Sequence, residues 1–229
     1  MICGLPLYFP FICLRFLIFY RKQTQNQGKK GKIEMLYVFG IIASYLLGSV
    51  PFGVLVTRWT GHGDLRHIGS GNIGAANVMR AGGLRLGVLT WVLDMAKVVI
   101  AVLIGFYVGN IGFAAWCGFA AVFGHCFPVW LGFHGGKGVS CLFGVLLMLN
   151  PWMFIICGIE WLVVALSLGY SSLASLVVFV VAPILGFVIG TNVGLALLMI
   201  SLVGIWRHHE NIGRLVGGTE SKLSWRWKK

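Results

Sequence analysis

The chain has 229 residues, of which 58% are hydrophobic and 10% charged, and its mean hydropathy is +0.89. This composition leaves too little polar surface to cover a soluble globule of this length, so it excludes an ordinary soluble domain and predicts an integral membrane protein. The formal net charge of +12 is typical of a membrane protein with basic cytoplasmic loops and anionic partners, and we expect no nucleic-acid binding.

The first 34 residues do not fit a regular membrane topology. Residues 2–20 are apolar enough to span, but five basic residues follow them between positions 21 and 32. A signal peptide carries its charge before the apolar stretch, so that interpretation fails. We expect residues 1–34 to be an upstream extension with Met35 as the functional start, residues 35–220 to form the membrane domain, and residues 221–229 to be a basic tail.

Several apolar stretches of about 20 residues can cross a bilayer as helices, because a helix satisfies its own backbone hydrogen bonds in hydrocarbon. Residues 139–168 are too long for one comfortable span, and Asn150-Pro151 in their middle predicts a break. The other spans are expected at Leu36–Thr57, Gly87–Val108, Gly112–Leu131, Leu173–Ile189 and Val193–Trp206.

The distribution of Lys and Arg supports a count of seven. With a turn at Asn150-Pro151, the basic segments 58–85, Lys137 and 207–229 fall on one side, and the three connections on the opposite side contain no Lys or Arg. Basic loops face the cytoplasm. We therefore predict an all-α, polytopic protein of seven transmembrane helices, with the start of the first helix outside and the polar segments and tail inside.

Glycine and small polar residues dominate the first polar segment, Gly48–Gly53 followed by Gly69–Arg80. Glycines let backbone amides approach an anion, and Arg80 offers a planar charged fork suited to phosphate. A tight turn without a ligand is the alternative. A dinucleotide fingerprint also fits the glycine spacing but lacks a preceding strand, so we reject it. The candidate ligands are Gly69, Ser70, Gly71, Asn72, Asn77 and Arg80.

A lone lysine stands among glycines in the second polar segment, Gly124–Pro128 followed by Gly132–Ser140. At the foot of a helix it places a mobile cation beside backbone amide donors, which predicts a phosphate cradle. The glycine spacing differs from that of a Walker A loop. Interfacial packing is the open alternative for His125 and His134. The candidate ligands are His125, Gly135, Gly136, Lys137 and Gly138.

The third polar segment runs from Arg207 to Glu220. On a helix, His208, Asn211 and Leu215 share one face. A basic helix lying on anionic headgroups is the alternative, and we prefer it for residues 224–229. For Asn211 and Glu220 we favour a functional role. The candidate site residues are His208, Asn211, Arg214 and Glu220.

Two further features concern buried chemistry. Asp94 and Lys97 lie three residues apart inside a span, so an ion pair is expected, with a substrate role for Lys97 as the alternative. Neighbouring His208 and His209 point apart on a helix, so we expect no metal site, and we expect no cofactor. The six cysteines show no paired spacing and are expected as small buried hydrophobes.

The three segments resemble, in order and spacing, those of the PlsY family of acyl-phosphate:glycerol-3-phosphate acyltransferases. The matching motifs are GSVPFG with GSGNIGAANVMR, GHCFPVWLGFHGGKGV and HHENIGRLVGGTE, within residues 35 to about 220. The family differs in usually having Thr at position 76 and Lys at position 134, where this chain has Ala76 and His134. The second difference removes a positive charge beside the lysine.

The resemblance implies transfer of a fatty acyl group from acyl phosphate to the 1-hydroxyl of glycerol 3-phosphate, giving lysophosphatidate and phosphate. It implies a multi-pass protein of the bacterial inner membrane with a cytoplasmic site, and a soluble acyl phosphate synthase is a candidate docking partner. It further implies that Ser70, Arg80, Lys137, His208 and Asn211 bind one of the two substrates, with Glu220 as a further site residue.

No Ser-His-Asp constellation or His-x4-Asp box is present, so we expect catalysis by positioning and by neutralising phosphate charge. A transporter for a small anion is a rival interpretation, since intramembrane charges and glycine-broken helices also mark transport sites. A structural lipid-binding protein is a third. The gathering of the polar motifs at one membrane surface argues against the transporter, and a structural protein would need no such dense phosphate-type motifs.

Overall fold

The computed structural model describes residues 30–223 and contains helices joined by short connections. The chain divides into two compact units after Val38, and each is described by itself. In the first unit, residues 30–38 form the initial turns of helix α2. The second unit, from Phe39 onward, holds the rest of the described chain. Residues 1–29 and 224–229 lie outside the description, together with Cys3, Cys13 and most of the expected extension.

The helices of the second unit are apolar along most of their length. Their bounds are α2 Lys30–Gly48 (from Phe39), α3 Phe52–Trp59, α4 Ala75–Val108, α5 Ile111–Cys126, α6 Val139–Leu149, α7 Pro151–Leu168, α8 Ser171–Ile189, α9 Thr191–Arg207 and α10 His209–Val216, with short 3-10 turns at Leu65–His67 and Val129–Leu131.

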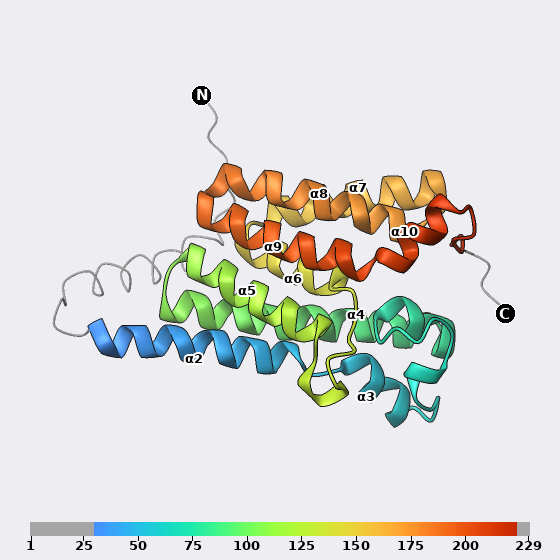
Figure 1. The fold of residues 1–229 in the computed structure, drawn as a ribbon, viewed down its shortest axis with the longest axis horizontal. Coiled ribbons are helices and arrows are strands. Elements are labelled where there is room, and N and C mark those ends of the chain that lie inside the picture. The colour runs from blue at the N-terminus through green and yellow to red at the C-terminus, as the bar shows by residue number, and fades with distance from the viewer. Residues whose placement is uncertain (1–29, 224–229) are drawn as a thin grey trace. The chain divides into compact units, whose positions relative to one another are not determined.

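The longer helices of the second unit lie alongside one another, with the shorter α6 among them (Figure 1). The longer ones are α2, α4, α5, α7, α8 and α9. Helix α3, the first turns of α4 and helix α10 gather at one end, hereafter the polar end. The connections after α4, α6 and α8, which carry no Lys or Arg, lie at the other.

The count of spans depends on the length demanded of each. Within residues 30–223, five helical segments are long and apolar enough to cross a membrane, and a sixth qualifies if α9 and α10, bent by 58°, count as one span. Helix α6 has only 11 residues and fails the length requirement by itself. The all-helical, polytopic membrane fold is therefore confirmed, and seven is an approximate number of spans.

Two expected boundaries differ from the observed ones. The expected span Leu36–Thr57 is interrupted, because α2 ends at Gly48 and α3 begins after Pro51, whose ring removes a backbone donor. Helix α4 begins at Ala75, well before the expected Gly87, and breaks at Gly83, where φ is +82°. The break at Asn150 is confirmed, and its side chain accepts a hydrogen bond from Trp152 N at 2.9 Å.

Close helix packing depends on two glycines between α2 and α5. A Cβ at Gly48 would lie 2.0 Å from Ala121 O, and a Cβ at Gly124 would lie 2.2 Å from Tyr45 O. Contacts of this kind let backbones approach where no hydrophobic effect drives helices together in lipid. They fix the polar end of α5, where the second polar segment begins.

Candidate active site

The first polar segment folds as a turn held from inside by one amide side chain. Asn77 accepts a hydrogen bond from Ser70 N at 3.1 Å and donates to Ile68 O at 2.8 Å. It is 1% exposed, so its polar atoms serve the turn. Gly69 and Gly71 adopt φ of +59° and +68°, a region that favours glycine. The expected residues therefore meet in one structure, with Asn77 as its internal support.

The groups that this turn presents outward are the Ser70 hydroxyl and the Arg80 guanidinium. Both residues are exposed, and neither side chain forms a hydrogen bond or ion pair within the described part of the chain. Asn72 accepts from Gly74 N at 2.9 Å, which shapes the entry into α4. The first turn of α4 points its backbone amides into the same region, where an anion is favoured.

The second polar segment lies over the end of α5. Gly135 N donates to Cys126 O at 3.1 Å and Gly136 N to His125 O at 3.0 Å. These two amides are therefore engaged within the protein. Gly138 ends the segment as the left-handed N-cap of α6, with φ of +80°. The amides left for an anion belong to the first turn of α6, directly after Lys137.

Arg207, at the end of α9, holds the other side of this segment. Its Nε donates to Gly136 O at 3.0 Å and its Nη2 to Gly135 O at 2.6 Å. The guanidinium also lies over the rings of Phe127 and Trp206, 5.8 and 5.9 Å from their centroids. Arg207 was not among the expected site residues, and only its place beside His208 in the third segment could have indicated it.

Lys137 joins the second polar segment to the third. Its Nζ donates to Asn211 Oδ1, and Asn211 Nδ2 donates to Glu220 Oε1 at 2.7 Å. Glu220 Oε2 accepts from Arg214 Nε at 2.7 Å. Lys137 thus forms one hydrogen-bonded chain with three expected residues of the third segment, which lie more than 70 positions away in the sequence. We call Lys137, Asn211, Arg214 and Glu220 the polar-end cluster.

Charge and burial tune this cluster. Burial lowers the pKa of the Lys137 ammonium from its usual 10.5, and repulsion by Arg214 adds to the effect. Burial alone would raise the pKa of Glu220, but hydrogen bonds from Asn211 and Arg214 outweigh it and hold that pKa below its usual 4.5. A bound dianion would therefore stabilise the charged form of Lys137. Glu220 remains an ionised carboxylate that orients Asn211.

His208 lies at the bend between α9 and α10. Its Nδ1 donates to Gly204 O at 2.7 Å, which fixes the tautomer and leaves Nε2 as an acceptor. The ring is 3% exposed and packs edge-on against Phe179 with centroids 5.7 Å apart. His134, by contrast, is exposed and donates from Nδ1 to Gly132 O within its own turn.

Two expected candidates are buried beneath the polar end. Lys97 is 1% exposed and His125 4% exposed, and Lys97 Nζ lies 2.8 Å from Asp94 Oδ1. The expected ion pair is therefore present, and Lys97 does not extend to the water-facing surface. The cysteines that the structure describes are buried free thiols.

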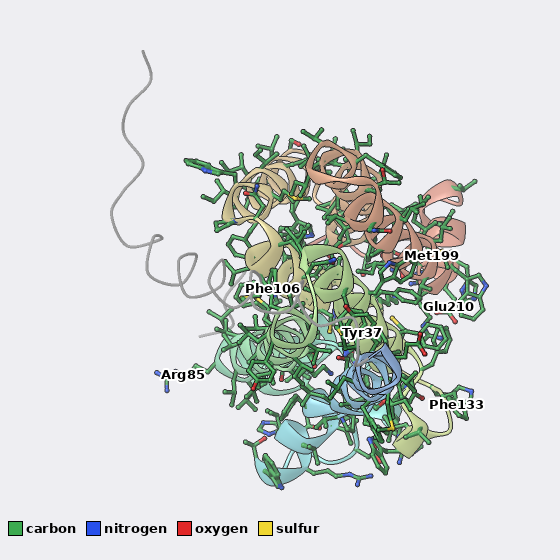
Figure 2. All side chains as sticks on the ribbon, turned by 90° about the vertical axis from the view of Figure 1, so that its left-hand side faces the viewer. Tyr37, Arg85, Phe106, Phe133, Met199 and Glu210 are labelled. Carbon is green, nitrogen blue, oxygen red and sulfur yellow. The ribbon has the colours of Figure 1, made fainter. Side chains whose placement is uncertain are left out.

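The surroundings of the first and second segments also pack together. Leu131, which lies between the two parts of the second segment, packs against a small apolar cluster that includes Ile73 and Val78 of the first. All three polar segments lie toward one end of the helices (Figure 1). Arg85 lies at the molecular edge (Figure 2), whereas Glu210, which is also exposed, lies 3.9 Å from Arg214 of the polar-end cluster.

A helical bundle with its phosphate-type groups at one end defines a multi-pass membrane protein with a surface site. The model of the family described as glycerol-3-phosphate acyltransferase matches residues 38–218. A glycerol-3-phosphate acyltransferase of Rhizobium etli is 45% identical over 184 residues, which cover 80% of this chain and 89% of that one. One from Agrobacterium fabrum is 43% identical over 189 residues, 82% and 92% of the two chains.

Solved structures agree with the sequence relatives. The crystal structure of PlsY, an integral membrane glycerol 3-phosphate acyltransferase, in its glycerol 3-phosphate form has a TM-score of 0.78 and 39% identity, covering 82% of this chain and 96% of that chain. Its lysophosphatidic acid form gives 0.77 and 38%, covering 82% and 95%. The chain belongs to the glycerol-3-phosphate acyltransferase family and is a membrane-integral acyltransferase.

Proposed function

We propose that this enzyme transfers a fatty acyl group from acyl phosphate to the 1-hydroxyl of glycerol 3-phosphate, giving lysophosphatidate and inorganic phosphate. Its relatives are named for acylation of glycerol 3-phosphate, and the related PlsY has been crystallised in glycerol 3-phosphate and lysophosphatidic acid forms. Both proposed substrates carry a phosphoryl group, so the site must hold two anions next to the membrane.

The observation that carries the proposal is the polar-end cluster. Lys137 pairs with a neutral amide oxygen of Asn211 rather than with a carboxylate. A phosphoryl oxygen is a stronger acceptor for an ammonium group than an amide oxygen, so a substrate can replace Asn211 at Lys137 without breaking an ion pair. Arg80 and Ser70 offer further donors from the first segment at the same end.

The roles follow from what each group can donate. Lys137 and Arg80 neutralise phosphoryl charge, Ser70 donates a hydroxyl hydrogen bond, and the first turn of α6 adds backbone amides. Asn211 and His208 orient the bound oxygens, with His208 accepting at Nε2. Glu220 holds Asn211 and does not touch the reacting atoms. These assignments carry the expected residues over as one proposed site.

The chemistry proceeds by direct transfer. The 1-hydroxyl oxygen attacks the acyl carbonyl carbon, the bond from that carbon to the phosphate oxygen breaks, and the hydroxyl proton passes to a phosphate oxygen. Acyl phosphate is already activated, so bringing the two substrates together supplies much of the acceleration. The Thr60 hydroxyl contacts His62 Nδ1 at 3.0 Å but lies 2.8 Å from Val56 O, to which it donates, so it is not poised as a nucleophile.

The same residues favour an orientation. Basic residues gather at the polar end, and the tendency for basic loops to face the cytoplasm places the site on the cytoplasmic side of a bacterial inner membrane. Glycerol 3-phosphate then arrives from the cytosol, while the acyl donor is supplied from the bilayer or by a soluble acyl phosphate synthase docking on this basic end. Cysteine labelling at Ser221→Cys in sealed spheroplasts tests the side: no reaction with an impermeant reagent is expected until the cells are opened.

The reaction itself is tested with purified protein, acyl phosphate and labelled glycerol 3-phosphate in detergent. Lysophosphatidate and phosphate should appear in equal amounts without any membrane gradient. Formation of product from acyl carrier protein or acyl-CoA thioesters, with none from acyl phosphate, would contradict the proposed donor. Isolation of an acylated protein residue would contradict direct transfer.

A further inference from the structure

A buried ionic cluster lies directly below the second polar segment. Lys97 Nζ is 2.8 Å from Asp94 Oδ1 and 3.0 Å from His125 Nδ1, and it donates to Val50 O at 2.8 Å. The side chains of Asp94, Lys97 and His125 are 1 to 4% exposed. We call these three residues the buried triad.

Groups from three parts of the fold hold the ammonium group of Lys97. It donates hydrogen bonds to Val50 O, in the connection between α2 and α3, and to His125 Nδ1 of α5, and it forms an ion pair with Asp94 of α4. Since Nδ1 of His125 accepts, its Nε2 carries the proton. The triad therefore joins the first polar segment, through Val50, to the beginning of the second, through His125.

The triad also holds the position that a metal ion would need. Ligand atoms of Asp94, His125 and Cys141 lie within 4.8 Å of one another. Lys97 Nζ already lies against two of them, and Cys141 Sγ donates to the backbone oxygen of Asp94 at 3.5 Å. The cation at this position is thus a side chain of the protein, which binds no phosphate because it is enclosed.

His125 connects the triad to the segment that carries Lys137. Its carbonyl accepts from Gly136 N at 3.0 Å, and a Cβ at Gly136 would lie 2.0 Å from His125 Nε2. Gly136 therefore lies directly on the imidazole ring. Arg207 Nε donates a hydrogen bond to Gly136 O on the side opposite the ring. The backbone just before Lys137 is thus enclosed between the His125 ring and a guanidinium group.

We propose that the buried triad is a positioning device for the proposed phosphate site: Lys97, by fixing His125, sets the path of Gly135 and Gly136 and thereby the place of Lys137. The inference rests on the proposed role of Lys137 in binding a phosphorylated substrate. It assigns a function in substrate binding to two intramembrane charges that never touch substrate.

A buried ion pair adds little net stability, because the desolvation of its two charges offsets their attraction. Exchanging both charges for neutral groups of similar size is often neutral for stability, whereas removing one leaves an unpaired buried charge and is strongly destabilising. The paired exchange therefore separates folding from positioning. It should preserve the fold but remove the donor that holds His125 Nδ1.

The test uses the full-length double variant Asp94→Asn/Lys97→Met in detergent, with Glu160→Gln as the matched control for a neutralised acid inside a span. Lys137 is labelled with an amine-reactive reagent, with and without glycerol 3-phosphate or inorganic phosphate, and the modified fraction is read by mass spectrometry. Steady-state assays then give kcat and KM for both substrates, because displacement of a binding group by about 1 Å can cost up to about 10²-fold.

We expect the double variant to melt near the parental temperature and to lose protection of Lys137 by phosphate ligands, with KM for at least one substrate raised about tenfold or more. Gly136→Ala, which inserts a methyl against His125, should give the same loss. Equal protection and equal KM values in the double variant and the parent, with only less folded protein, would overturn the inference. Absence of protection in the parent and in Glu160→Gln would overturn the proposed site, and this inference with it.

Discussion

Two lysines of this protein, Lys137 and Lys97, are held in opposite ways. Lys137 is half-buried at the polar end and donates to the neutral amide of Asn211, so a phosphoryl oxygen of a substrate would be a stronger acceptor for it. Lys97 is enclosed, donates to Val50 O and His125 Nδ1, and forms an ion pair with Asp94. Lysine thus serves as a proposed ligand-binding cation at position 137 and as an internal structural group at position 97. Enclosure and an ion pair with a carboxylate distinguish Lys97 from Lys137, which is partly exposed and pairs with a neutral amide.

The largest expected effect separates the lysines by activity. Lys137→Ala removes the cation proposed to neutralise a phosphoryl group, and kcat/KM should fall by about 10²–10³-fold. The melting temperature should stay close to that of the parent. Burial disfavours the charged form of Lys137 and lowers its pKa, so this ammonium group adds little to the stability of the fold. Arg85→Ala is the matched control, an outward-facing basic residue, and should leave kcat/KM unchanged (Figure 2). Near-parental activity of Lys137→Ala would remove the distinction between the two lysines.

A smaller effect is expected from the carboxylate behind Asn211. Glu220→Gln keeps the shape but removes the charge that orients Asn211 and pairs with Arg214, so KM for a phosphorylated substrate should rise about tenfold, as for other groups supporting a ligand-binding residue. Glu210→Gln is the control. This exposed acid lies on α10 and also pairs with Arg214, at 3.9 Å, but it forms no hydrogen bond with Asn211. Equal KM values in both variants would show that Glu220 does not position the site.

Acid pH should weaken the polar-end cluster through the same residue. The pKa of Glu220 is lowered in the folded protein, so its carboxylate contributes stability that is present above the usual 4.5 and is lost as pH falls through the folded value. The difference in melting temperature between the parent and Glu220→Gln should therefore be largest at neutral pH and shrink below about pH 4.5. A difference that grows on acidification would contradict this sign.

The smallest effect belongs to a third group of charges. Asp64 binds Arg58 and Arg66 at 2.7 and 2.6 Å, and both arginines are exposed. The arginines lower the pKa of Asp64, but such water-facing pairs contribute little net stability. Asp64→Asn should leave both the melting temperature and KM unchanged. A large loss would mean that exposure is a poor guide to which charges matter here.

The sequence predicted much of the fold because apolar length and proline are strong signals. The predicted break at Asn150 appears as the start of α7, and the predicted spans 173–189 and 193–206 appear as α8 and α9. The kink at Gly83 and the interruption before α3 were missed. Both features depend on the backbone conformation of a few residues at the polar end. The hydropathy of the sequence carries no information on that conformation.

The sequence predicted which polar segments come together but not what each of their residues contacts. Lys137, Asn211, Arg214 and Glu220 meet as expected, because their glycine-rich and helical contexts carry a phosphate-type signal. Sequence could not show that Asn77 supports a turn. Nor could it show that Arg207 holds backbone carbonyls, because the residues that it contacts lie 71 and 72 positions away.

The central claim is that the three polar segments grip phosphoryl groups together at one end of the helices. A crystal structure of this protein with glycerol 3-phosphate and an acyl phosphonate that cannot transfer its acyl group tests it most directly. The account predicts a phosphoryl oxygen about 3 Å from Lys137 Nζ in place of Asn211 Oδ1, with Arg80 and Ser70 on phosphoryl oxygens as well. Both phosphoryl groups bound away from Lys137, with its bond to Asn211 intact, would contradict it.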